Sequence, residues 1–109
     1  MRNGFGWPMS MYFRLKMRKI VRQIVREVAD GLWPDVMRKK PGCSSAELGE
    51  YVQVRAAQLV HPRIDAVLKA HPSVSGAIAT QLLAIATGGV QANIKRRLAE
   101  LSARSRKAA

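Results

Sequence analysis

Residues 10–30 of the chain read SMYFRLKMRKIVRQIVREVAD, and this stretch decides the fold class. Apolar side chains recur every three or four residues, while arginine or lysine occupies the opposite side, which is the pattern of an amphipathic helix. Ser10 is suited to cap the start of this helix and Gly31 to end it. The apolar positions are Phe13, Met17, Ile20, Val21, Ile24 and Val28. We therefore expect a long basic amphipathic helix near the N-terminus.

The composition is that of one small folded domain. The chain has 109 residues, of which 48% are hydrophobic and 24% charged, and these values exclude wholesale disorder and collagen-like structure. The single cysteine, Cys43, cannot form an internal disulfide, which favours a reducing compartment. We therefore expect a cytoplasmic protein.

Turn-forming residues divide the remainder into further helical segments. A proline disfavours the α conformation of the residue before it, and a glycine pair ends or kinks a helix. Ser44 and Glu47 have capping-box spacing, which predicts the start of another helix. The expected boundaries are Gly31, Pro34, Pro41–Gly42, His61–Pro62, His71–Pro72 and Gly88–Gly89.

These boundaries predict an all-α fold, a small bundle of four to six helices that begins with the long basic helix. We expect a flexible aromatic arm over residues 1–9, because Gly4, Gly6 and Pro8 oppose a helix there while Phe5 and Trp7 supply rings. A single helical domain then covers residues 10–103, and a basic tail covers residues 104–109.

The charge lies at the two ends of the chain. Residues 1–40 carry ten basic and three acidic side chains, residues 41–72 carry three of each, and residues 73–109 carry six and one, so the sums are +7, 0 and +5. Their total of +12 predicts an anionic partner. We expect a non-enzymatic protein that binds DNA or RNA mainly through phosphates, alone or within a nucleoprotein complex. The candidate contacts are Arg14, Arg18, Lys19, Arg22, Arg26, Lys95, Arg96 and Arg97.

Three other classes of function remain open at this stage. Small residues such as Ala77, Ala79, Ala84 and Ala86 would let a helix approach closely, so the chain could be an assembly subunit or homo-oligomer with an acidic protein partner. A basic helix poor in acids is also typical of a membrane-surface helix or a targeting presequence. Residues 70–94 lack charge, but their many polar side chains make a membrane span unfavourable. An amphipathic membrane-surface protein ranks third among these interpretations, so a membrane is the least expected partner.

Motifs for catalysis or cofactor binding are absent from the sequence. It has no Gly-rich phosphate loop, no Cys-X-X-Cys and no His-Glu-X-X-His. Cys43, His61 and His71 match no catalytic or metal-ligand spacing that we can identify. We therefore expect no catalytic residues, no metal site and no cofactor.

One part of the chain has the segment lengths of a helix-turn-helix, with a first helix at 63–70, a turn at 71–73 and a second helix at 74–86. Its second helix would offer Ser73, Ser75, Thr80 and Gln81 to a DNA groove but no lysine or arginine, which specific contacts usually require. A plain helical hairpin is therefore the better interpretation.

The expected lack of a metal site can be checked directly. Treatment of the purified protein with a chelator should leave its thermal unfolding curve unchanged, because no set of side chains has ligand spacing. Stoichiometric zinc in elemental analysis would contradict this expectation.

Overall fold

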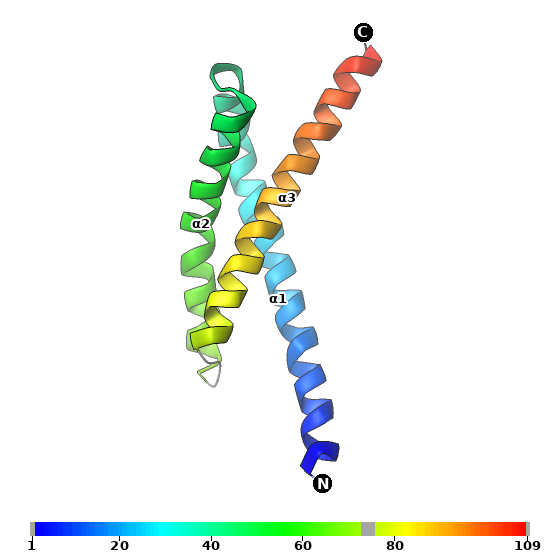
Figure 1. Ribbon diagram of the computed structural model, residues 1–109, viewed down its shortest axis with the longest axis vertical. Coiled ribbons are helices and arrows are strands. Elements are labelled where there is room, and N and C mark those ends of the chain that lie inside the picture. Colours follow the sequence, from blue (N-terminus) through cyan, green and yellow to red (C-terminus); the bar gives the residue numbers. More distant parts are fainter. Residues whose placement is uncertain (1, 73–75, 109) are drawn as a thin grey trace.

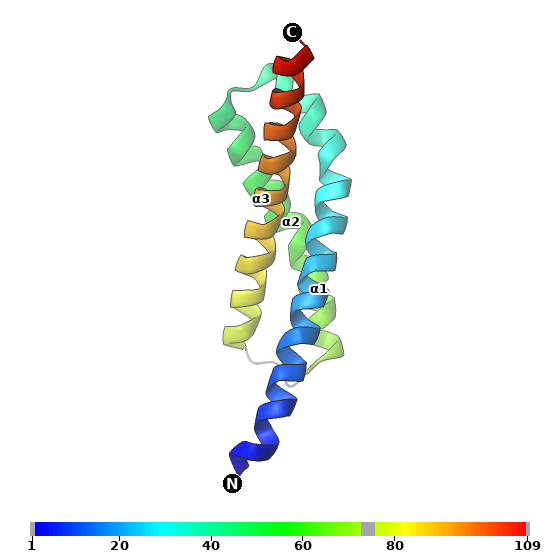
Figure 2. The same ribbon diagram turned by 90° about the vertical axis from the view of Figure 1, so that its right-hand side faces the viewer.

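The computed structural model describes the backbone of residues 2–72 and 76–108 and the side chains of residues 13–72 and 76–107. α1 and α3 run in the same direction, and α2 runs in the opposite direction beside both of them (Figures 1 and 2). The all-α prediction is confirmed, but the expected four to six helices are wrong, because the described chain has three. Its elements are α1 (Arg2–Lys39), the 3-10 turn η1 (Lys40–Gly42), α2 (Ser45–Ala70) and α3 (Gly76–Ala108).

The first expected boundary, at Gly31 and Pro34, does not end α1. Val28, Leu32 and Val36 follow one another at four-residue spacing and are 4%, 0% and 0% exposed. Burial on both sides of the boundary holds the helix together, and the Pro34 ring lies on the exposed side. The contribution of these three side chains outweighs the cost of an interior proline, about 3 kcal/mol.

The two His-Pro pairs behave differently. Pro62 lies inside α2, where His61 and Pro62 are exposed while Val60 and Ile64 are buried. The helix therefore continues through the first pair, contrary to our expectation. The second pair does end α2: His71 leaves the helical conformation, and its backbone N–H donates to the Leu68 carbonyl at 3.1 Å.

The capping box at the start of α2 is confirmed. The backbone N–H of Glu47 donates to Ser44 Oγ at 3.1 Å, and the backbone N–H of Ser44 donates to Glu47 Oε1 at 2.8 Å. The second of these bonds is the main reason why the pKa of Glu47 lies below its ordinary value. Two backbone donors at the helix start are thus satisfied by local side chains.

The core is a series of aliphatic rows, and in α2 and α3 every fourth residue is buried. Four-residue ridges on two helices interlock when the helices cross obliquely rather than lie parallel. Figure 1 shows the result, with α3 crossing α1 near its middle and the ends of the two helices diverging. The rows are Leu48, Val52, Ala56, Val60 and Ile64 in α2, and Leu82, Ala86, Val90 and Ile94 in α3.

The glycine pair of α3 lies at this crossing and does not break the helix. A Cβ placed on Gly89 would lie 2.8 Å from Cγ2 of Val25, whereas a Cβ on Gly88 would meet nothing within 4 Å. Gly89 is therefore a contact surface for α1, and Gly88 faces open space. The expectation that the pair ends or kinks the helix is wrong, because Ala86 and Val90 are both fully buried and hold the helix on either side.

The N-terminal segment differs from the predicted arm in its backbone. α1 begins at Arg2, so residues 2–9 are helical in the structure, although they contain Gly4, Gly6 and Pro8. The helix thus starts earlier than the Ser10 cap that we expected. The flexibility of this segment stays a prediction.

The turn of the helix-turn-helix considered from the sequence cannot be compared with the structure, because residues 73–75 lie outside the described residues.

The two glycines provide a matched test of the crossing. Gly88→Ala should stabilise the protein by about 0.5–1 kcal/mol, because alanine costs less entropy in a helix interior. Gly89→Ala should instead destabilise it by about 1 kcal/mol, because the new methyl group displaces the stiff Val25 side chain. In the double variant Gly89→Ala/Val25→Ala most of the steric cost should disappear. Thermal unfolding measures all three, and equal effects of the two glycine variants would argue against the close approach.

Candidate functional site: a cationic arc beside an apolar groove

The N-terminal half of α1 carries a dense set of exposed cations. Between residues 13 and 26 there are six basic side chains and no acidic one. All six are exposed, and none forms an ion pair with any residue whose side chain the structure describes. We call this set the cationic arc: Arg14, Lys16, Arg18, Lys19, Arg22 and Arg26.

The arc stays unpaired because the nearby acids of α1 are used to fasten helices. Glu27 pairs with Arg63 of α2, and Asp30 pairs with Arg97 of α3. The pKa of Glu27 lies below its ordinary value of 4.5, first because Gln23 donates a hydrogen bond to it at 3.0 Å and next because Arg63 does so. The acids thus serve the fold, and the excess positive charge faces solvent.

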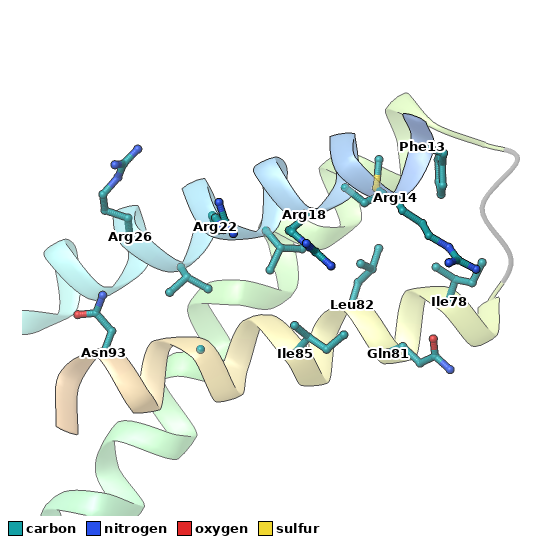
Figure 3. Close-up of a pocket in the computed structure, with 14 residues that line it drawn as sticks. Phe13, Arg14, Arg18, Arg22, Arg26, Ile78, Gln81, Leu82, Ile85 and Asn93 are labelled. Carbon is teal, nitrogen blue, oxygen red and sulfur yellow. The ribbon is translucent and has the colours of Figure 1, made fainter. Parts of the chain in front are cut away.

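A groove of about 850 Å³ lies between this half of α1 and the first half of α3. Its base is apolar, formed mainly by Met17, Val21 and Val25 of α1 and by Leu82 and Ile85 of α3. Figure 3 shows the two helices flanking it, with side chains from both directed into the space between them.

Four arginines of the arc line one side of the groove. Arg14, Arg18, Arg22 and Arg26 follow one another at four-residue spacing, which corresponds to about 6 Å per step along the helix. In Figure 3 Arg14 and Arg18 reach toward α3, whereas Arg26 points away from it. The groove therefore has one strongly cationic side.

The α3 side is uncharged. It presents Ile78, Gln81 and Ile85 near the start of α3, and Gly89 and Asn93 at and beyond the crossing. Ile85 is 60% exposed, although it forms part of the apolar base. Among the described residues that line the groove there is no carboxylate.

The structure separates the remaining predicted site residues from this groove. Lys19 is exposed on α1 outside the groove, and Lys95 and Arg96 are exposed on α3 after the crossing point. In Figure 1 that part of α3 lies toward the opposite end of the molecule from the start of α1. Lys19, Lys95 and Arg96 are therefore not part of the groove lining.

Arg97 makes several contacts within the chain. Its Nε donates to Asn93 Oδ1 at 2.7 Å, its Nη2 pairs with Asp30, and its Cζ lies 5.7 Å from the centre of a Trp33 ring. The side chain is 26% exposed. Arg97 therefore fastens α3 to α1 in the structure, and we leave it out of the proposed binding surface.

Sequence reasoning missed two features of this site. Lys16 belongs to the arc, and its presence in a segment without acids was the available signal. The groove itself was not foreseen, because Gln81, Ile85 and Asn93 become part of it only through the crossing of two helices distant in sequence.

The cysteine and histidines do not form a reactive centre. Cys43 precedes α2 and His71 follows it, so the length of a 26-residue helix, about 39 Å, separates them. His61 has Asp65 Oδ2 at 3.3 Å from its Nδ1 on the exposed side of α2. Within the described residues there is no group of three or more His, Cys, Asp and Glu that could hold a metal ion.

One described helix is long and apolar enough to cross a membrane by length and composition. Its most apolar 18-residue window in Gly76–Lys107 has a mean hydropathy of 1.2, and 22% of that window is buried. A core helix also satisfies this criterion, and α3 places Ala86, Val90 and Ile94 in the core.

Comparisons with known protein families, with curated proteins and with solved structures found no match for this chain.

The contact between Glu27 and Arg63 should make the stability of the fold depend on pH. Because the folded pKa is lowered, this contact stabilises the fold above the ordinary value of 4.5 and is lost as the pH falls through the folded value. Arg63→Gln should raise the pKa of Glu27 toward 4.5, whereas Arg55→Gln, on the same helix and bonded to Gln58, should leave it unchanged. NMR titration of the Glu27 carboxyl measures both, and an identical pKa in the two variants would contradict the interhelical pair.

Proposed function

We propose that the protein is a non-enzymatic nucleic-acid-binding protein of the cytoplasm that holds DNA or RNA by phosphate contacts from the cationic arc. The observation that carries this proposal is the set of six exposed cations without ion-pair partners among the described residues. Phosphate contacts require positive charge along a surface and little else.

The dimensions of the arc support this proposal. Arg14 and Arg26 are twelve residues apart in α1, or about 18 Å along the helix axis. Duplex DNA presents a phosphate about every 1.7 Å of its axis when both strands are counted, so the arc spans about ten phosphates. The N-terminal end of α1 extends beyond the other two helices in both views (Figures 1 and 2), and the arc begins after this projecting part.

The chemistry of the arc favours binding that does not depend on sequence. Base reading uses arginine together with Asn, Gln or acidic side chains placed against base edges. Between Arg14 and Arg26 the only side chain of these types besides arginine is Gln23, and its amide donates a hydrogen bond to Glu27. We therefore assign backbone contacts to the arc and no base contacts.

The second candidate is an assembly subunit, favoured by one specific observation. Ala77 and Ala84 of the Ala-rich helix are exposed on α3, while Ala86 is buried. Exposed small residues on a helix allow another helix to approach closely. In this alternative the positive charge matches an acidic protein.

Replacement of cations in the arc tests the first proposal. The variant Arg18→Gln/Lys19→Gln/Arg22→Gln/Arg26→Gln should keep the fold, because all four side chains are exposed. It should bind short duplexes and single strands of unrelated sequences more weakly. Each lost phosphate contact should reduce the slope of log K against log salt by about 0.7 to 0.9, so four contacts remove roughly three units.

A control variant removes the same charge elsewhere. Lys40→Gln/Lys69→Gln/Arg106→Gln/Lys107→Gln alters four exposed cations outside the arc and should retain most of the slope. Fluorescence anisotropy at several salt concentrations gives the slopes, and circular dichroism verifies the helices. An unchanged slope in the arc variant with retained helicity would reject the proposal and favour the assembly subunit.

A further inference from the structure

The apolar base of the groove is not explained by phosphate binding. Leu82 belongs to the buried core and Val21 packs against it, but Ile85 is 60% exposed on the groove. Phosphate contacts account for the arginines and have no use for this exposed isoleucine. Stacking of bases would need several aromatic rings, and Phe13 is the one aromatic residue among the described residues that line the groove. A ligand for this groove must therefore have an apolar side of its own.

The shape of the groove fits an α-helix. Two helices that diverge from a crossing form it, and its α1 side extends from Phe13 to Arg26, about 20 Å. A helix of about thirteen residues has this length. Helices that bind in such grooves insert apolar side chains at i, i+3, i+4 and i+7, which would contact Val21, Leu82 and Ile85.

The charge of the groove selects among such helices. Arg14 and Arg18 lie four residues apart and reach toward α3 (Figure 3), so two carboxylates at four-residue spacing on a bound helix would each meet one arginine. A second copy of this chain carries a net charge of +12 and would be repelled. The complementary ligand is acidic on one face and apolar on the adjacent face.

We propose that this groove binds an acidic amphipathic helix of a partner protein, with Arg14 and Arg18 facing its carboxylates and Ile85 contacting its apolar stripe. Because these arginines also belong to the cationic arc, and on the assumption that the proposed function is correct, the acidic helix and nucleic acid exclude each other. A partner with such a helix would then release bound nucleic acid.

A synthetic helical peptide serves as the probe. Its sequence places leucine at i, i+3, i+4 and i+7 and glutamate at every fourth position beside that stripe, and a second peptide has glutamine in place of each glutamate. The acidic peptide should bind the wild-type protein more tightly as salt is lowered, and the glutamine peptide at least tenfold more weakly. Equal binding of the two peptides would overturn the proposal.

Matched protein variants locate the peptide. Ile85→Gln should weaken peptide binding about tenfold by removing apolar contact, whereas Val54→Gln, at 55% exposure on α2, should not change it. Arg18→Gln should weaken it about threefold, and Lys19→Gln, exposed outside the groove, should leave it unchanged. If Ile85→Gln does not alter peptide binding, the peptide does not bind against Ile85, and the proposal that it lies in this groove is overturned.

The two proposals fail separately. Lys19→Gln should weaken nucleic-acid binding but not peptide binding, and Ile85→Gln should do the reverse, since it changes no charge. Loss of nucleic-acid binding in Ile85→Gln with no effect on the peptide would assign the groove to nucleic acid and overturn the helix proposal. A dimer in sedimentation that Ile85→Gln dissociates would assign the groove to a second copy and also overturn it.

Discussion

The approach of Gly89 to Val25 is the contact on which the rest of this structure depends. With no side chain on Gly89, α1 and α3 meet at close range, and the buried four-residue rows set them at an oblique angle. Helices that cross at one point must diverge on both sides of it. The groove beside the cationic arc lies on one side, and a smaller cavity of about 260 Å³ beside Trp33 and Arg97 lies on the other.

The sequence predicted correctly that the chain is helical, but it placed helix ends at several residues where the helices continue. Residue types at Gly31, Pro62 and Gly88 weaken a helix locally, and each was expected to mark a boundary. In every case buried aliphatic residues lie within a few positions on both sides, and their packing offsets the local cost. The helix does end at His71, and the first buried residue that the structure describes after it is Leu82. The segments that these residues were expected to separate therefore join into three long helices instead of four to six, because tertiary burial holds them together.

The candidate site was predictable to the extent that it depends on one helix. Four-residue spacing places Arg14, Arg18, Arg22 and Arg26 along one side of α1, and this follows from helix geometry alone. The contribution of α3 does not, since Ile85 and Asn93 reach the groove only through the crossing. The contacts of Arg97 also depend on the packing of α3 against α1. This side chain was predicted to contact phosphate, and in the structure it lies against Trp33 and Asp30 of α1.

The parallel course of α1 and α3 also determines how the molecule responds to tension. The start of α1 and the end of α3 lie at opposite ends of a body 64 Å long (Figure 1). A force that pulls these ends apart slides α1 and α3 past each other in shear instead of peeling them apart. Two contacts oppose that sliding: the packing of the Val25 side chain against Gly89, and the ion pair between Asp30 and Arg97. The crossing contact therefore lies between the two helices that such a force would load.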